Sequence, residues 1–298
     1  MNIKNYTDPT SLHLPLSVTY YDPQYLLSQH HSNLQIFTND HFLIPFSIKN
    51  QVAKSIDKSP FGSYLQLSHL QQNSFPTFEK KVELELQKNQ VDQIEIRHPS
   101  SIYSDFVDSS ELTKVGYDLQ YNDINQHIVL SGNWEDQIHD MQRRKLKALR
   151  QDGFEFQEIP HAELETIHKF LTVCRQAQGL QLNISLEKLL QLSSVLPNAY
   201  EVFGVHREGK LSAVCITVNV TTSTAYYYLA GTSPLFRSHS PMVLLIAGMV
   251  THYHSKGYKI FDLGVSSYEG QPQETLRLFK ERMGAHETKK PTLVKSLR

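Results

Sequence analysis

The chain has 298 residues, of which 40% are hydrophobic and 20% charged, with a formal net charge of −1. This length predicts a globular protein of about two domains, and the near-neutral charge disfavours DNA or other non-specific nucleic-acid binding as the main role. No apolar run approaches the roughly 18 residues of a membrane span and the N-terminus is polar, so we expect a cytoplasmic protein without a membrane span.

The N-terminal half predicts a mixed sheet with one or two helices. LQIFT and HFLIPFSI, within residues 34–48, indicate a hairpin across Asn39-Asp40. The other elements expected here are the strand SYLQLS, a helix over 75–90, the strand QIEIRH, and a closing pair of strands at 113–121 and 127–130. We place the domain boundary near Ser131-Gly132, which gives domains 1–131 and 132–298.

The C-terminal half has clearer periodicity. Apolar residues at helical spacing predict a helix from Asn133 to Arg150, and FEFQEI (154–159) alternates like a strand. The elements expected next are helices at 162–178 and from Ser185 to about Pro197, and antiparallel strands at 200–206, 211–220 and 224–230. The chain should then form a helix at 240–256, a strand at 258–263, a helix at 272–283 and a last strand at 286–296.

The segment from Thr224 to Gly284 carries the strongest functional signal. It predicts a strand, a polar loop (TSPLFRSH), a helix and a second strand. The free N–H groups at the start of that helix and the positive end of its dipole favour an anion there. Arg237 lies in the preceding loop, where a guanidinium would reinforce such a site. We therefore expect the chemistry in this segment.

These motifs resemble a known family. The helix SPMVLLIAGMV after an arginine-containing loop, the strand KGYKIFDLG and the helix LFKERMGA are similar to those of the GNAT acyltransferase fold. The resemblance covers residues from about 150 to 298 and lies in the branch of the Fem-type peptidoglycan aminoacyltransferases and their acetyltransferase-like relatives. It implies an α/β (α+β) fold of two tandem GNAT-like domains, each a mixed, largely antiparallel twisted sheet flanked by helices.

One departure from the family pattern concerns the donor phosphate. GNAT enzymes bind the CoA pyrophosphate through R/Q-x-x-G-x-G/A, and the matching positions here are Arg237, Ser240 and Met242. Glycine serves there because phosphate oxygens approach the backbone closely. The arginine is kept and both glycines are lost, which argues against an ordinary CoA mode. The Fem-like branch commonly lacks this signature too.

The resemblance also implies the donor-site residues. The lysine that matches Lys280 lies near the transferred acyl group or its phosphate, where an ammonium offsets charge developing on the carbonyl oxygen. We expect the carrier to contact Arg237, Ser238, His239, Ser240 and Phe279. The alternatives are a solvated helix lysine, a loop arginine and chance placement of His239. Ser240 is also expected to cap the following helix.

Amide formation requires a proton acceptor for the attacking amine. Asp262, on its strand, and Glu269, in the next loop, are the candidates. For Asp262 a structural hydrogen bond to loop amides is the competing interpretation. Tyr227 and Tyr228 are candidates for substrate contact, although Tyr227 should point opposite to its neighbours and core packing explains each of them as well.

Basic residues crowd one predicted helix. Arg143, Lys147 and Arg150 share a face and suit an RNA or a phosphorylated donor, but a solvated helix face is the preferred interpretation. His252 and His254 are two residues apart on a helix, so they are not expected to form a metal pair. No metal site is expected.

The sequence thus predicts an N-acyltransferase. It would move an acyl group from an activated carrier to a small-molecule amine or an amino-acid-like acceptor by direct attack. We expect acyl-CoA, such as acetyl-CoA, as a co-substrate and no tightly bound cofactor. The alternatives are a Fem-type aminoacyltransferase that uses aminoacyl-tRNA on a peptidoglycan precursor, and a non-catalytic GNAT-like scaffold.

Overall fold

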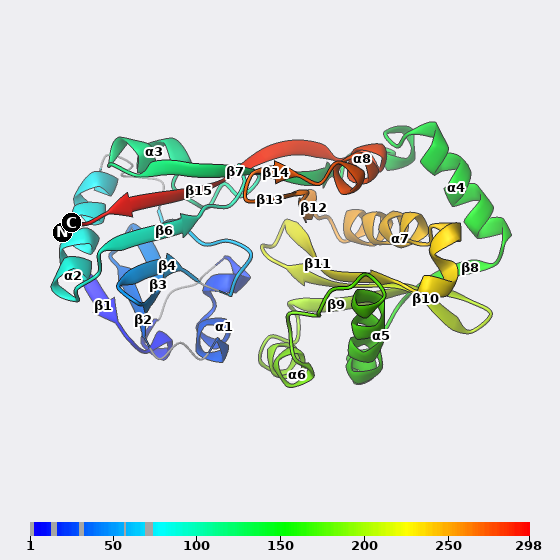
Figure 1. Ribbon diagram of the computed structural model, residues 1–298, viewed down its shortest axis with the longest axis horizontal. Helices are drawn as coiled ribbons and strands as arrows, with labels where there is room; N and C mark the ends of the chain where they lie inside the picture. Colours follow the sequence, from blue (N-terminus) through cyan, green and yellow to red (C-terminus); the bar gives the residue numbers. More distant parts are fainter. Residues whose placement is uncertain (1–2, 13–16, 30–32, 57, 69–73) are drawn as a thin grey trace. The chain divides into compact units, whose positions relative to one another are not determined.

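The computed structural model describes residues 3–12, 17–29, 33–56, 58–68 and 74–298 (Figure 1). The chain forms two compact units. Unit 1 comprises Met1–Asn125, Ser267–Pro272 and Thr288–Arg298, and unit 2 comprises Gln126–Ser266 and Gln273–Glu287. The domain boundary predicted near residue 131 stays a prediction. The two units are defined by contacts in space, and each combines segments that are distant in the sequence. No helix within the described residues is long and apolar enough to cross a membrane.

Unit 1 holds a mixed sheet and short helices. Its strands are β1 (Lys4–Tyr6), β2 (Leu34–Thr38), β3 (Phe42–Lys49), β4 (Val52–Ser55), β5 (Leu65–Gln66), β6 (Gln93–Arg97), β13 (Ser267–Tyr268) and β14 (Gln271–Pro272). Its α-helices are α1 (Pro23–Ser28), α2 (Phe75–Lys88) and α3 (Ser109–Lys114). β7 (Asp118–Val129) and β15 (His286–Ser296) have residues in both units.

The predicted hairpin across Asn39-Asp40 is confirmed, since β2 and β3 pair antiparallel. The closing pair of strands predicted at 113–121 and 127–130 is confirmed only in part. Residues 118–129 are strand, but they form one continuous strand, β7, and α3 occupies 109–114. Gly116, at φ +92°, ends the helix. The polar run within DLQYNDINQHIV suggested a loop, but its first residues form a strand that is mostly exposed or half-buried.

A buried charge cluster lies in the core of unit 1. The Lys295 ammonium is 2.9 Å from the carboxylate of Glu79 and 3.1 Å from that of Glu83, and it donates to the Val115 carbonyl. Tyr64 and Tyr117 share a hydrogen bond of 3.0 Å beside it. Because buried charges require partners, these contacts offset the desolvation of the lysine and tie β15 to α2.

Unit 2 carries the motifs that point to function. Its elements are α4 (Asp140–Gln151), β8 (Phe154–Glu158), α5 (Leu164–Gln176), α6 (Leu186–Val195), β9 (Tyr200–Arg207), β10 (Lys210–Asn219), β11 (Thr224–Thr232), α7 (Met242–Ser255), β12 (Ile260–Val265) and α8 (Glu274–Arg282). Strands β8 to β11 are antiparallel neighbours, whereas β12 lies parallel to β11. All of these elements were expected. The helix expected from Asn133 begins at Asp140, after a 3-10 helix at Trp134–Asp136, and the other ends differ by at most two residues.

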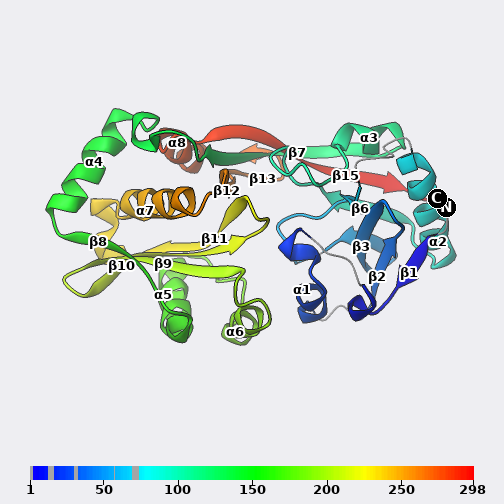
Figure 2. The ribbon, with the colours of Figure 1, turned by 180° about the vertical axis from the view of Figure 1, so that it is seen from behind.

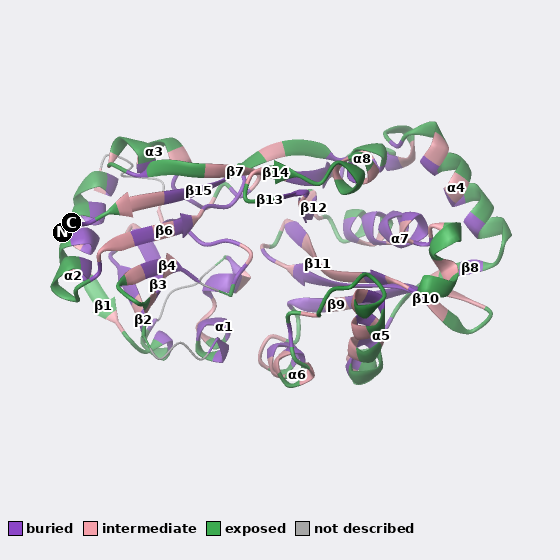
Figure 3. Ribbon diagram, in the orientation of Figure 1, coloured by how far each residue is buried: buried purple, intermediate pink, exposed green. Residues whose placement is uncertain are grey.

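The helices of unit 2 cover both faces of its sheet. Helices α5 and α6 lie on one face and α7 on the other, as the views from front and back agree (Figures 1 and 2). Most residues of α7 are buried, from Val243 to Tyr253, and α4 alternates buried and exposed positions (Figure 3). The apolar run that was too short for a membrane span therefore forms the central helix of this core.

The packing of α7 on β8 depends on Gly248. A Cβ atom at this position would overlap the Phe156 ring, which stacks on Phe203 with centroids 5.6 Å apart. The helix therefore approaches the sheet more closely than an alanine allows.

We expect Gly248→Ala to destabilise the protein by about 1–3 kcal/mol, because overpacking outweighs the gain of about 1 kcal/mol that alanine usually brings to a helix. Denaturant unfolding measures this change. In a Phe156→Ala background, the further change Gly248→Ala should no longer lower stability, because the overlapping ring is gone. A Gly248→Ala protein more stable than the wild type would contradict this packing.

Glu201 anchors the end of α7 to β9. Its carboxylate accepts from His252 (3.2 Å), Lys256 (2.5 Å) and Tyr253 (2.9 Å). Burial raises the pKa of Glu201, but these three hydrogen bonds oppose burial and bring the pKa down to about 2. The ionised carboxylate is therefore part of the folded structure.

Because the folded pKa lies below the unfolded value of about 4.5, this stabilisation is complete above about pH 4.5 and is lost as the pH falls toward 2. We expect Glu201→Gln to lower Tm at pH 7 and to flatten the acid dependence of stability in that window. Thermal melts between pH 2 and 7 measure both effects, and an unchanged acid limb would contradict this account.

Candidate functional site

The site is built where β11 and β12 part. The two strands pair over three residues, Thr224–Tyr226 with Ile260–Asp262, and β11 then continues to Thr232 with no further register to β12 in this described segment. A β-bulge on β11 next to Tyr228 interrupts its pairing with β10. The regular pairing of the two strands thus ends at Tyr226 and Asp262.

Asp262 lies at this separation and is 1% exposed. Its Oδ1 accepts a hydrogen bond of 2.9 Å from the Gly264 amide, so the structural role considered from the sequence is present. Gly264 has φ +71°, a conformation that favours glycine. The Tyr226 hydroxyl is 3.1 Å from where a Gly264 Cβ would stand. Burial, and then the Asp262 charge, raise the pKa of Tyr226, which keeps the phenol neutral.

Lys280 is buried, at 4% exposure, so the interpretation as a solvated helix lysine is wrong. Its ammonium, on α8, donates to the carbonyl oxygens of Gly264 (3.0 Å) and Val265 (2.8 Å). These bonds join α8 to the end of β12. Lys280 therefore fixes the backbone that also presents an amide to Asp262, and Phe279 next to it packs partly buried against the core.

His127, on β7, is a buried group near Asp262 that the sequence analysis did not single out. Its Nδ1 has no hydrogen-bond partner within the described part of the chain, and its ring centroid lies 6.0 Å from that of His286. Burial lowers the pKa of His127. The charge of Asp262 raises this pKa, and His286 lowers it further.

The segment before α7 differs from the expected polar loop. Residues Pro234–His239 form a 3-10 helix, and Ser240 follows at φ +58° and ψ +49° with its amide bonded to the Arg237 carbonyl. The expectation that Ser240 caps α7 is wrong: Pro241 holds the N-cap position, with no side-chain capping bond. Ser240 closes the 3-10 helix instead, because its left-handed backbone turns the chain into α7.

A lysine contacts the segment just before α7. The Lys145 ammonium, on α4, donates to Ser240 Oγ at 3.2 Å, and the first turn of α7 contains no acidic residue. Arg237 is exposed. Its charge lowers the pKa of the nearby Cys174 thiol, but burial has the larger effect and raises that pKa to about 11. A positive side chain beside the positive end of a helix is unfavourable, and an anion bound there would relieve that repulsion.

His239 and Ser238 lie in the same segment. His239 Nε2 is 3.3 Å from Arg207 Nη1, which only donates, and Ser238 Oγ is 3.4 Å from His239 Nδ1. The Arg207 guanidinium also lies over the Phe154 ring, 5.1 Å from its centroid. His239 therefore links the 3-10 helix to Arg207 on β9 and to Phe154 on β8.

Tyr227 and Met242 contact each other. The Tyr227 hydroxyl donates to Met242 Sδ at 3.0 Å, and both side chains pack against the core of unit 2. The Met242 side chain is thus turned toward β11. Tyr228 pairs its ring with Tyr200 at 6.4 Å, and burial raises its pKa to about 12. Core packing explains these contacts, and a role for Tyr227 or Tyr228 in substrate binding stays a prediction.

Glu269 is exposed and belongs to the turn between β13 and β14, where it has φ +48°. This turn is in unit 1, whereas Asp262 and Lys280 are in unit 2. A role for Glu269 as a proton acceptor stays a prediction.

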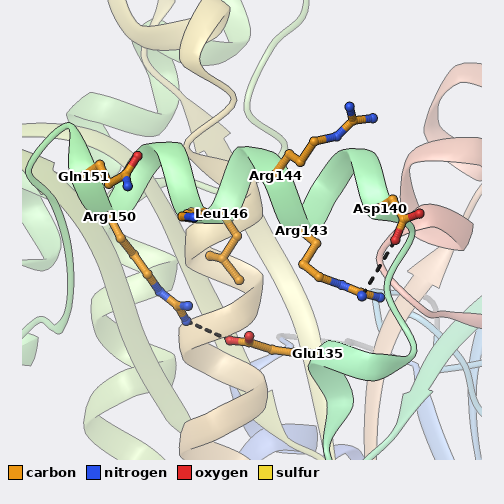
Figure 4. Close-up of a pocket in the computed structure, with 8 residues that line it drawn as sticks. Glu135, Asp140, Arg143, Arg144, Leu146, Arg150 and Gln151 are labelled. Atoms are coloured by element: carbon orange, nitrogen blue, oxygen red, sulfur yellow. Dashed lines mark hydrogen bonds and ion pairs between the residues drawn. The ribbon is translucent and has the colours of Figure 1, made fainter.

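Helix α4 lines a groove of about 810 Å³ (Figure 4). We name it the α4 groove; its residues are Glu135, Asp140, Arg143, Arg144, Leu146, Lys147, Arg150 and Gln151. Arg150 pairs with Glu135 at 2.9 Å and Arg143 with Asp140 at 3.7 Å. Figure 4 shows Arg143 and Arg150 directed to the side of Glu135, while Arg144 extends the other way.

Within the described residues, no group of three or more His, Cys, Asp or Glu side chains is arranged to hold a metal ion. His252 binds Glu201 through its ring nitrogen, as described above.

Comparison with known proteins agrees with this geometry. Residues 139–271 match the family model Acetyltransf_6, described as an acetyltransferase (GNAT) domain. No curated protein sequence matches the chain. FemX has a similar structure, with a TM-score of 0.72 and 11% identity over 99% of this chain and 97% of that one.

Two further solved structures are similar. One is the C-terminal domain of a putative lysylphosphatidylglycerol synthetase from Agrobacterium fabrum (TM-score 0.63, 13% identity, 89% of this chain and 84% of that one). The other is a tandem GNAT protein from the clavulanic acid pathway (TM-score 0.53, 8% identity, 100% and 99%). The predicted resemblance to the GNAT fold and its Fem-type, tandem branch is confirmed, as is the mixed α/β fold class.

The clamp between Lys280 and β12 leads to a stability prediction. We expect Lys280→Met to destabilise the protein by about 2–4 kcal/mol, because two buried carbonyls lose bonds to a charged donor. Denaturant unfolding measures this loss. The exposed α8 variant Arg282→Met serves as a control and should change stability by less than about 0.5 kcal/mol. A Lys280→Met protein as stable as the control would contradict the clamp.

Proposed function

We propose that the protein is an N-acyltransferase. It transfers an acyl group from a thioester of the CoA type to a small amine or an amino-acid-like acceptor. The attack is direct, without a covalent enzyme intermediate. The observation that carries this proposal is the buried Asp262 at the separation of β11 and β12, next to the backbone held by Lys280. The GNAT domain match supports the same reaction class.

The donor phosphates would lie at the start of α7. Lys145 donates to Ser240 there, Arg237 is exposed, and the first turn lacks acidic residues. A phosphate placed between these cations and the helix dipole gains charge-assisted hydrogen bonds. The acyl arm would extend from this point toward Asp262.

The chemistry is thioester aminolysis. An alkylammonium, with a pKa near 10.4, has no lone pair at neutral pH, so the amine must lose a proton. The amine nitrogen attacks the carbonyl carbon, the C–S bond breaks, and the thiol leaves. Asp262, or a water beside it, would accept the amine proton. Lys280 acts as a positioning residue, because its ammonium is bonded to the carbonyls of Gly264 and Val265.

A second candidate is a Fem-type transfer from aminoacyl-tRNA. The cationic residues of the α4 groove suit phosphodiesters, because Arg143, Lys147 and Arg150 lie on one helix face, although two carboxylates interrupt the positive charge. The near-neutral net charge of −1 weighs against it. A cytoplasmic location is part of both proposals.

Acyl-CoA binding tests the proposal. A ligand at one hundred times its Kd stabilises by about 2.7 kcal/mol, which raises Tm by about 5 °C or more for a chain of this size. We expect such a rise with a panel of acyl-CoAs, and its loss in Arg237→Ala. Arg298→Ala, in unit 1, is the matched control and should keep it.

Release of free thiol with an amine panel tests the reaction itself. Asp262→Asn should lower kcat by about 10²-fold or more while the thermal shift remains. No shift with any thioester would exclude the CoA-type donor. A shift without turnover would favour the non-catalytic scaffold.

A further inference from the structure

The α4 groove contains cations that the fold does not use. Arg144 and Lys147 are exposed and form no ion pair or hydrogen bond with any part of the chain that the structure describes. Arg143 and Arg150 are exposed too, and each pairs with one carboxylate. Four cations and two carboxylates give the groove a net charge of +2, whereas the whole chain has −1. The positive charge is therefore concentrated locally.

The groove adjoins the start of α7. Lys145 belongs to the same helix as the groove residues and reaches Ser240 from its other side. The two sites are thus separated by about one helix diameter, roughly 10–12 Å. A molecule docked in the groove reaches the proposed phosphate position only through an extended arm.

We propose that the α4 groove docks an acidic carrier protein that bears the acyl group on a thiol-terminated arm with a single phosphodiester. This inference rests on the proposed function, because it names the form of thioester donor that the site accepts. The arm would pass α4, place its phosphodiester near Lys145 and Ser240, and bring its thioester toward Asp262.

The mixed charges of the groove favour a protein over a nucleic acid. Glu135 and Asp140 lie among the cations, where they repel a continuous phosphodiester backbone but complement the mixed charges of a protein helix. From Arg143 to Arg150 the row covers eight residues, or about 10 Å of helix, which matches two turns of a partner helix. A polynucleotide gains more from a longer and purely basic row.

The start of α7 favours an arm over free CoA. A pyrophosphate needs close backbone approach, and Ser240 and Met242 place Cβ atoms at both positions where that approach uses glycine. An arm with a single phosphodiester has one phosphate instead of two, so it requires less of this close approach to the backbone. The reaction is unchanged and balanced: the C–N bond forms, the C–S bond breaks, and the proton that the amine loses passes through Asp262 or water to the departing sulfur, which stays on the arm as a thiol.

Charge reversal on α4 tests this proposal. The variant is Arg144→Glu with Lys147→Glu, and the matched control is Lys169→Glu with Lys210→Glu, which reverses two exposed lysines elsewhere on unit 2. The probes are an acidic acyl carrier protein with an acetylated phosphopantetheine arm, acetyl-CoA, and total tRNA. Binding is measured by fluorescence anisotropy and transfer by thiol release, after thermal melts establish that both variants are folded.

We expect the α4 variant to weaken binding of the carrier protein by about tenfold or more, with a strong salt dependence in the wild type. The α4 variant should bind acetyl-CoA within about twofold of the wild type. The control variant should bind both the carrier protein and acetyl-CoA within about twofold of the wild type. Equal losses for carrier protein and acetyl-CoA would overturn the proposal, because the groove would then bind nucleotide phosphates. Loss of tRNA binding alone would overturn it in favour of RNA.

Binding and transfer fail independently in this design. The carrier protein without an acyl group tests docking alone, so wild-type binding without any transfer would sink the proposed function and leave the docking surface intact. Transfer from acetyl-CoA with no binding of the carrier protein would retain the proposed function and eliminate this inference.

Discussion

The separation of β11 from β12 is the constraint on which the rest of unit 2 depends. Two parallel strands that pair over three residues and then part leave backbone groups that must be satisfied in another way. The Lys280 ammonium bonds the carbonyls of Gly264 and Val265, and the Asp262 carboxylate bonds the Gly264 amide. Two opposite charges thus hold one short stretch of backbone at the point where the strands diverge.

These same groups link stability to chemistry. Buried charges are costly unless each has partners, so a lysine and an aspartate persist at this place only while the surrounding backbone keeps its geometry. In the proposed reaction Asp262 accepts a proton, and Lys280 holds the backbone to which the Asp262 carboxylate is bonded. A structural role and a functional role are therefore compatible in the same pair.

Much of unit 2 could be predicted from the sequence, because its apolar residues repeat at helical or strand spacing. Strands β9 to β11 and helix α7 are examples, each recognisable from a run of eight or more residues. Strand β7 was missed in part, since its polar residues hide a strand that is held by its neighbours in the sheet. The local sequence of β7 does not indicate a strand there, and pairing with the neighbouring strands decides its structure.

The site was less predictable for a related reason. Lys280 and Arg237 were identified through motifs, but the carbonyl partners of Lys280 depend on how α8 meets β12. Ser240 suggested a helix cap, whereas its left-handed backbone and the bond from Lys145 follow from the turn into α7. No spacing in the sequence links Lys145 to Ser240, because the two lie 95 residues apart.

A crystal structure of the protein with a thioether analogue of acetyl-CoA, in which the S–C bond is not cleaved, tests the central claim most directly. The account predicts a phosphate bonded to Ser240 and Arg237 at the start of α7, with the acyl carbonyl at the separation of β11 and β12 beside Asp262. An ordered ligand bound elsewhere, with these residues untouched, would contradict it.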